Sequence, residues 1–162
     1  MDDLGNLLEL LHTDRTIEEQ AVCEAAFRGI LDGEPVDQAG LVTATDLPPE
    51  GVRTLLQGLT ERGLIVLEPN SGQVIGSWGL SSVQTGHRLR IRNRELFAWC
   101  ALDAVGIPAA LGEDANITST CRQCGSIIHV ELTRGRVTLA DPADVWLWLS
   151  ACHVGRSVVG FT

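Results

Sequence analysis

The sequence has no lysine and no tyrosine, and only 4% of its 162 residues are aromatic. It also has no apolar run that reaches the roughly 18 residues a helix needs to cross a bilayer. Its start, MDDLGNLLELLHTDR, is acidic, whereas signal and transit peptides are basic. We therefore expect neither an exported protein nor one that acts at a membrane, but a cytoplasmic protein.

The charge is unevenly distributed along the chain. Residues 1–84 carry four Arg against fourteen Asp and Glu, whereas residues 85–162 carry eight Arg against seven acids. The net charge is −9, and the apolar content of 44% is typical of a folded globular protein. Because an acidic surface repels a phosphate backbone, we expect no binding to nucleic acid.

The first half is predicted to be mainly helical. Capping residues such as Thr16 and Glu19, apolar spacing, and Pro or Gly boundaries mark its elements. The predicted helices span residues 4–12, 17–31, 38–43 and 49–62, and the strands of a hairpin span 64–68 and 73–78. The last three of these helices, followed by the hairpin, have the order of a winged helix. We therefore predict an acidic, winged-helix-like N-terminal domain over residues 1–80.

The second half is predicted to be richer in strands. A strand over 81–94 is expected to precede a buried helix over 95–105, which Gly106 and Pro108 end. The further predicted strands span residues 117–120, 126–133, 136–140 and 144–152. Residues 81–162 are thus predicted to form a small β-rich C-terminal domain around one buried helix, and the fold class is α+β.

Four arginines share one face of the strand predicted over 81–94, and Leu89 and Ile91 share the other. The four are Arg88, Arg90, Arg92 and Arg94. Such a row can bind an anion, or it can pair with the acidic first half. We favour the pairing.

The chain has five cysteines, and an odd number without an export signal argues against a disulfide framework. Cys23 lies on an apolar helix and is expected in the core. Cys100 and Asp103 are three residues apart, which places them on one face of the predicted buried helix. Burial raises the pKa of a carboxyl group, so this acid can hold a proton beside a thiol that binds an electrophile. The structural alternative is a buried Cys with an Asp paired to Arg90 or Arg92.

Cys121 and Cys124 have the Cys-x-x-Cys-Gly spacing of a metal knuckle. A tetrahedral zinc site needs two further ligands, which His129 or the Cys152-His153 pair could supply. Cys152 is also a candidate second thiolate beside Cys100. Two or three thiolates in one pocket select soft ions such as Hg(II), Cu(I) or Zn(II) over hard ions.

Three segments resemble alkylmercury (organomercurial) lyases. The stretch LFAWCALD, residues 96–103, followed by Ile-Pro-Ala at 107–109, is similar to the core motif of that family. Thr-Ser-Thr-Cys at 118–121 resembles the family's strand that ends in a second Cys, and Ala-Cys-His-Val at 151–154 resembles its late Cys-containing strand. The acidic helical first half also matches, so the resemblance covers about residues 15–155.

The resemblance implies that two thiolates and an aspartate cleave a carbon–mercury bond by protonolysis. Cys100 would bind the mercury, Asp103 would move the proton from thiol to carbon, and Cys152 would be the second thiolate. Simple alignment places Ala151 where the family has that second Cys, so Cys152 would need a bulge to face the pocket. Cys124 is an extra thiol.

Two hypotheses therefore stand from the sequence. The first is a lyase that needs no cofactor, acts on organomercury compounds with small thiols as partners, and holds Hg(II) as product. The second is a non-catalytic thiolate module or sensor for zinc, copper or mercury, with zinc at Cys121 and Cys124. The Cys100–Asp103 pair favours the lyase, because a metal store needs no acid. The sequence carries no signal for an oligomeric state.

Overall fold

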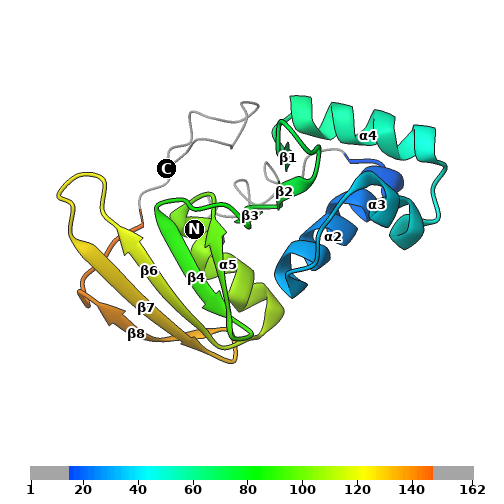
Figure 1. Ribbon diagram of the computed structural model, residues 1–162. Helices are drawn as coiled ribbons and strands as arrows, with labels where there is room; N and C mark the ends of the chain where they lie inside the picture. Colours follow the sequence, from blue (N-terminus) through cyan, green and yellow to red (C-terminus); the bar gives the residue numbers. More distant parts are fainter. Residues whose placement is uncertain (1–14, 148–162) are drawn as a thin grey trace.

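The computed structural model describes residues 15–147, which form four helices and an eight-stranded antiparallel sheet (Figure 1). This confirms a mixed class of helices and sheet, whereas the winged-helix assignment stays a prediction. The predicted helix over 4–12 and the residues Cys152 and His153 lie outside the described range. The elements, in chain order, are α2 (Ile17–Asp32), α3 (Gln38–Thr45), α4 (Pro49–Glu61), β1 (Ile65–Leu67), β2 (Val74–Ser77), β3 (Leu80–Ser81), β4 (His87–Ile91), β5 (Arg94–Ala98), α5 (Ala101–Leu111), β6 (Ala115–Thr120), β7 (Ile127–Thr133) and β8 (Arg136–Asp141).

The first three helices form where local sequence signals predict them. Thr16 and Glu19 make a reciprocal capping box at the start of α2, and Gly33 ends it with φ of 70°. Asp37 caps α3 by accepting a hydrogen bond of 2.7 Å from the Gly40 N–H. The predicted hairpin after α4 is also confirmed, as β1 and β2. Among the described residues, no helix is both long enough and apolar enough to span a membrane.

One continuous sheet joins the two halves of the chain. Its strand order is β1-β2-β3-β5-β4-β6-β7-β8, so the short strand β3 pairs with β2 on one side and with β5 on the other. Helices α2 to α4 gather beside β1 and β2, and α5 covers β4, β5 and β6 (Figure 1). The two-domain division stays a prediction, and its boundary between residues 80 and 81 falls inside β3.

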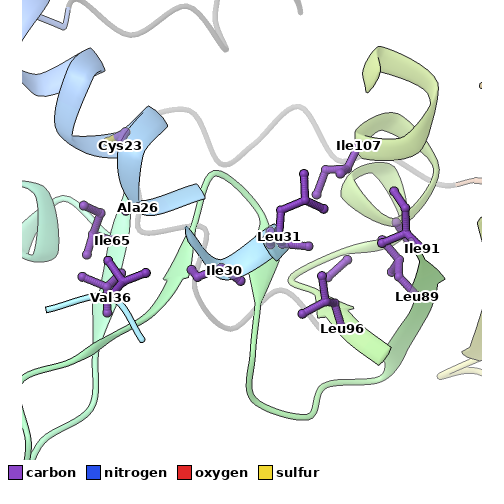
Figure 2. Packing of buried hydrophobic residues seen from close by; sticks show 14 of the residues in the cluster. Cys23, Ala26, Ile30, Leu31, Val36, Ile65, Leu89, Ile91, Leu96 and Ile107 are labelled. Atoms are coloured by element: carbon purple, nitrogen blue, oxygen red, sulfur yellow. The ribbon is translucent and has the colours of Figure 1, made fainter. Parts of the chain in front are cut away.

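The hydrophobic core is also continuous. Buried side chains of α2 and β1 belong to the same cluster as those of β4, β5 and α5. Figure 2 shows Leu31, at the end of α2, between the side chains of the first half and those of Leu96 and Ile107. The helical part is therefore packed against the part that carries Cys100.

The structure corrects the single strand predicted over 81–94. Arg92 and Asn93 both have positive φ, 50° and 58°, and form the tight turn of a hairpin between β4 and β5. Two consecutive positive-φ residues are the requirement of a type I′ turn, which joins antiparallel strands. Only Arg88 and Arg90 therefore lie on the exposed side of β4, and the row of four arginines is not formed.

The helix predicted over 95–105 is also wrong in its position. Leu96 and Ala98 point into the core from β5, which pairs with β3 and β4, and the helix α5 starts only at Ala101. It continues through Pro108 to Leu111 rather than ending at Gly106. Strand pairing on both sides of β5 outweighs the helix propensity of this segment.

In the last part of the chain, the strands β6, β7 and β8 confirm the predicted ones over 117–120, 126–133 and 136–140. The strand predicted over 144–152 is not present over the described residues 144–147. The remainder of that prediction lies outside the described range.

Candidate active site

Cys100 and Asp103 meet at the start of α5. The chain leaves β5 at Ala98, and two residues later Cys100 is the N-cap of the helix. Its thiol donates to Asp103 Oδ2 over 3.0 Å, and the Asp103 N–H donates back to Sγ over 3.4 Å. The predicted closeness of the pair is confirmed, but it arises from helix capping rather than from two positions on one helix face.

The Asp103 carboxyl group is held against a tight turn of the backbone. Trp78 and Gly79 both have positive φ and connect β2 to β3. A Cβ atom on Gly79 would lie only 2.3 Å from Asp103 Cγ. The Gly79 carbonyl also accepts a hydrogen bond of 2.8 Å from the Trp99 N–H, which ties the turn to the start of α5.

Gly79 is a site residue that sequence reasoning missed. Its only signal is a glycine between two apolar segments, Trp78 before it and Leu80 after it, which is typical of a two-residue hairpin turn. That signal predicts the turn but does not predict what packs on it.

Burial dominates the electrostatics of the pair. It raises the pKa of Asp103, while the hydrogen bond from Cys100 acts in the opposite direction. Burial, the negative charge of Asp103 and the hydrogen bond to it together raise the pKa of Cys100 to about 12. The thiol is therefore protonated at neutral pH, and the carboxyl group beside it accepts its hydrogen bond.

The structural alternative, Asp103 paired with an arginine, is not what the structure shows. Arg92 Nε donates to Glu113 over 2.8 Å, and Arg92 also bridges to Asp32 of α2 over 2.8 Å. The latter contact confirms pairing with the acidic first half for Arg92. Arg90 lines a shallow cavity of about 310 Å³ with Glu113 and Asp114, at the other end of β4 from Cys100.

Cys121 and Cys124 lie on the connection between β6 and β7. The Gly125 N–H donates to the Cys121 carbonyl over 2.8 Å, and the Cys121 N–H donates to the Ser126 carbonyl over 2.8 Å. The Cys124 thiol is exposed and lies 3.2 Å from Ser126 Oγ. Hydrogen bonds from Ser126, followed by one from the Cys121 thiol, lower the pKa of Cys124.

The predicted zinc ligands do not come together in the described part of the chain. Within residues 15–147, no three His, Cys, Asp or Glu side chains are placed to share a metal ion. His129 instead lies on β7, with Nδ1 3.4 Å from Thr118 Oγ1. The contribution of Cys152 and His153 stays a prediction. Cys23 is buried in α2 as expected, and burial raises its pKa to about 11.

Comparisons with known proteins match the chain to one family. The family model for alkylmercury lyase (MerB) matches residues 80–160, half of the chain. An alkylmercury lyase of Staphylococcus epidermidis is 33% identical over 129 residues, which cover 77% of this chain and 57% of that protein. One of Bacillus cereus is 32% identical over 121 residues, covering 72% of this chain and 53% of that protein.

The fold has a solved counterpart as well. A crystal structure described as the mercury-bound form of MerB2 superimposes with a TM-score of 0.89 at 27% identity, over 99% of this chain and 77% of that one. The chain spans little more than half the length of the two curated relatives. The matched family model and the curated relatives together show that the chain belongs to the alkylmercury lyase family.

Proposed function

We propose that this protein is an organomercurial lyase that cleaves a carbon–mercury bond by protonolysis and retains Hg(II). The observation that carries the proposal is the 3.0 Å contact between the Cys100 thiol and the Asp103 carboxylate. It joins a soft ligand for mercury to an acid that can carry a proton, inside a half-buried site. The mercury named for the solved MerB2 structure supports Hg(II) as the bound product.

The first step binds the substrate. Cys100 sulfur forms a bond to the mercury of R–Hg⁺, and its proton passes to Asp103 Oδ2. Mercury binding deprotonates a thiol outright, so the raised pKa of Cys100 does not prevent the step. The products are Cys100–S–Hg–R and a neutral Asp103 acid. Burial favours that neutral acid, because it raises the pKa of the carboxyl group.

The second step breaks the carbon–mercury bond. A second thiolate binds the mercury, the Asp103 proton moves to the carbon, and the electron pair of the bond stays with the carbon. The products are R–H, Hg(II) held by two thiolates, and the Asp103 carboxylate. Mercury remains divalent throughout, so the reaction needs no redox cofactor.

We assign the second thiolate to Cys152, with a small thiol as the partner that removes Hg(II). The support is the resemblance of residues 151–154 to the family's late Cys-containing segment. A cytoplasmic location supplies such thiols and keeps the protein's own thiols reduced.

Two variants test the proposal with phenylmercury as substrate and benzene release as the measurement. Cys100→Ser removes the mercury ligand, so it should abolish both binding in the pocket and benzene release. Asp103→Asn keeps the size and polarity but cannot deliver the proton. Binding should therefore survive, while release falls roughly 10²–10⁴-fold, the usual contribution of general acid–base catalysis.

Two outcomes would contradict these assignments. Wild-type protein that binds phenylmercury and releases no benzene over hours is not a lyase. If Asp103→Asn cleaves phenylmercury as fast as wild type, the chain still belongs to the family, but Asp103 does not transfer the proton.

The second candidate function is a non-catalytic thiolate module with structural zinc. The observation that favours it is the knuckle-like turn around Cys121 and Cys124, in which Gly125 has φ of 72°. Metal analysis of the protein as purified separates the two functions. Stoichiometric zinc that Cys124→Ser releases, together with unfolding, supports the module. Metal-free protein with free thiols supports the lyase.

A further inference from the structure

Two cysteines outside the Cys100 site share one tight turn. Cys121 and Cys124 are three residues apart on the connection between β6 and β7. Two backbone hydrogen bonds of 2.8 Å, Gly125 N–H to Cys121 O and Cys121 N–H to Ser126 O, close the turn that brings them together. Cys124 is exposed, so the pair is open to a ligand from solvent.

The pair lies at the same end of the sheet as Cys100. Strands β5 and β6 flank β4 and are both antiparallel to it, so they run in the same direction. His87, at the start of β4, is in register with Ala98 on one side and Ser119 on the other. Cys100 and Cys121 each follow two residues after those partners. The two segments that carry Cys100 and Cys121 therefore leave the sheet at the same end, with one strand between them, which is roughly 10 Å or two strand spacings.

The donor set of this turn selects the kind of ion it can hold. The described residues bring no third His, Cys, Asp or Glu to the pair, so they do not supply the four ligands of a tetrahedral zinc site. Two thiolates are soft ligands, and they suit a soft ion that is satisfied by two donors. Hg(II) is such an ion.

We propose that Cys121 and Cys124 form a second, two-coordinate site for a soft metal ion, and that this site takes Hg(II) from small-thiol complexes. In the exchange, both protein sulfurs bond to mercury, both small-thiol ligands leave, and the two protein protons pass to the departing thiolates. The equilibrium favours mercury on the protein, because the second sulfur of the pair binds intramolecularly, at a high effective concentration. The site does not depend on the cleavage reaction at Cys100.

The experiment uses the full chain with Cys100→Ser and Cys152→Ser, which removes the candidate catalytic thiols. The reduced protein is loaded with Hg(II) in a large excess of a small monothiol, desalted, and analysed for bound mercury. We expect one Hg(II) per chain. Adding Cys124→Ser should lower the affinity roughly 10²–10⁴-fold, because only one thiolate is left.

Adding Cys23→Ser to the same background is the matched control. It removes a buried thiol and should leave one Hg(II) bound. Bound mercury should also protect Cys121 and Cys124 from alkylation, measured by mass spectrometry on the peptide that contains both. Equal mercury retention with and without Cys124, at unchanged circular dichroism, would overturn the proposal.

The wild-type background separates this site from the catalytic one. Cys124→Ser alone should release benzene from phenylmercury at the wild-type rate, because Cys124 touches neither Cys100 nor Asp103. A large fall in that rate would assign the pair to the cleavage site and would contradict a separate one.

Discussion

At the scale of single residues, Cys100 combines two roles that usually pull its pKa in opposite directions. A cysteine at a helix N-terminus normally has a lowered pKa, because the first amides of the helix favour the thiolate. Backbone hydrogen bonds from Leu102 and Asp103 act in that direction here. Burial and the neighbouring Asp103 carboxylate outweigh them and raise the pKa to about 12. The Cys100 thiol is therefore protonated at neutral pH.

The charge of Asp103 has a consequence that can be measured without mercury. Because the carboxylate raises the pKa of Cys100, Asp103→Asn should lower that pKa and increase the thiolate fraction at a fixed pH. The alkylation rate of Cys100 by iodoacetamide at pH 8 should therefore rise, even though cleavage falls. Mass spectrometry of the peptide that contains Cys100 gives the rate.

Glu24→Gln is the matched control for this rate, because Glu24 is an exposed acid paired with Arg28 on α2. It should leave the alkylation of Cys100 unchanged. A slower reaction in Asp103→Asn than in wild type would contradict the assigned effect of the carboxylate.

At the scale of elements, the site is assembled where the β2–β3 turn, the end of β5 and the start of α5 meet. The β2–β3 turn packs against the Asp103 carboxyl group through Gly79. Strand β5 ends two residues before Cys100, which is the N-cap of α5. None of these elements positions the carboxyl group alone, because Gly79 and Asp103 are far apart in the sequence. The position of the Asp103 carboxyl group therefore depends on the hairpin before it.

Gly79→Ala tests this dependence. The new Cβ would lie within 2.8 Å of three carboxyl atoms of Asp103, so the carboxyl group must move. The residue also has φ of 83°, which costs a non-glycine residue roughly 1–2 kcal/mol. We expect benzene release to fall at least tenfold, because a 1 Å misplacement of a reacting group can cost about 10²-fold, while Hg(II) binding by Cys100 survives.

Gly72→Ala is the control for backbone strain. Gly72 has φ of 71°, but a Cβ there would meet no atom within 4 Å. Gly72→Ala should lower the midpoint of urea unfolding, because it introduces the same kind of backbone strain as Gly79→Ala. It should leave the rate of benzene release unchanged. Equal cleavage by both variants would remove the role of Gly79 in placing Asp103.

At the scale of the whole molecule, the helical part and the sheet are bound into one structure. β3 pairs across the boundary, Leu31 belongs to the shared core, and Arg92 bridges to Asp32. We therefore expect the described part of the chain to unfold as one unit, so that a group buried in α2 affects the stability of the Cys100 site.

The alkaline stability of the protein tests this coupling. The pKa of Cys23 is raised from 9.0 to about 11 by burial, so the folded state holds the thiol proton more tightly than the unfolded chain. Its contribution is complete below pH 9 and is lost as the pH rises toward 11, with a slope on the order of 1.4 kcal/mol per pH unit at most.

Cys23→Ala should therefore flatten the fall of stability between pH 9 and 11, measured by urea unfolding at several pH values. Cys100 keeps its own share of the fall in that variant, because its pKa is also raised. Benzene release, measured at each urea concentration, shows at what concentration the Cys100 site is lost. An unchanged pH slope in Cys23→Ala, or loss of cleavage well before loss of helix signal, would contradict the shared unit.

Features that depend on neighbours a few residues apart could be predicted from the amino-acid sequence alone. Thr16 and Glu19 define the start of α2, and Asp37 defines that of α3, because a cap needs only residues within one turn. The closeness of Cys100 and Asp103 is also local, because residues three apart are near each other whether both lie within a helix or the first one caps it. The motif that contains the pair was also enough to indicate the family.

The start of that helix and the residues around it depend instead on contacts between segments far apart in the chain. The segment before Cys100 is a strand because β3 and β4 offer hydrogen bonds on both of its sides, a fact that no local spacing contains. Long-range pairing likewise placed Gly79 under Asp103 and brought Cys121 to the same end of the sheet as Cys100. Backbone hydrogen bonds between distant strands, each needing a partner once buried, set these positions.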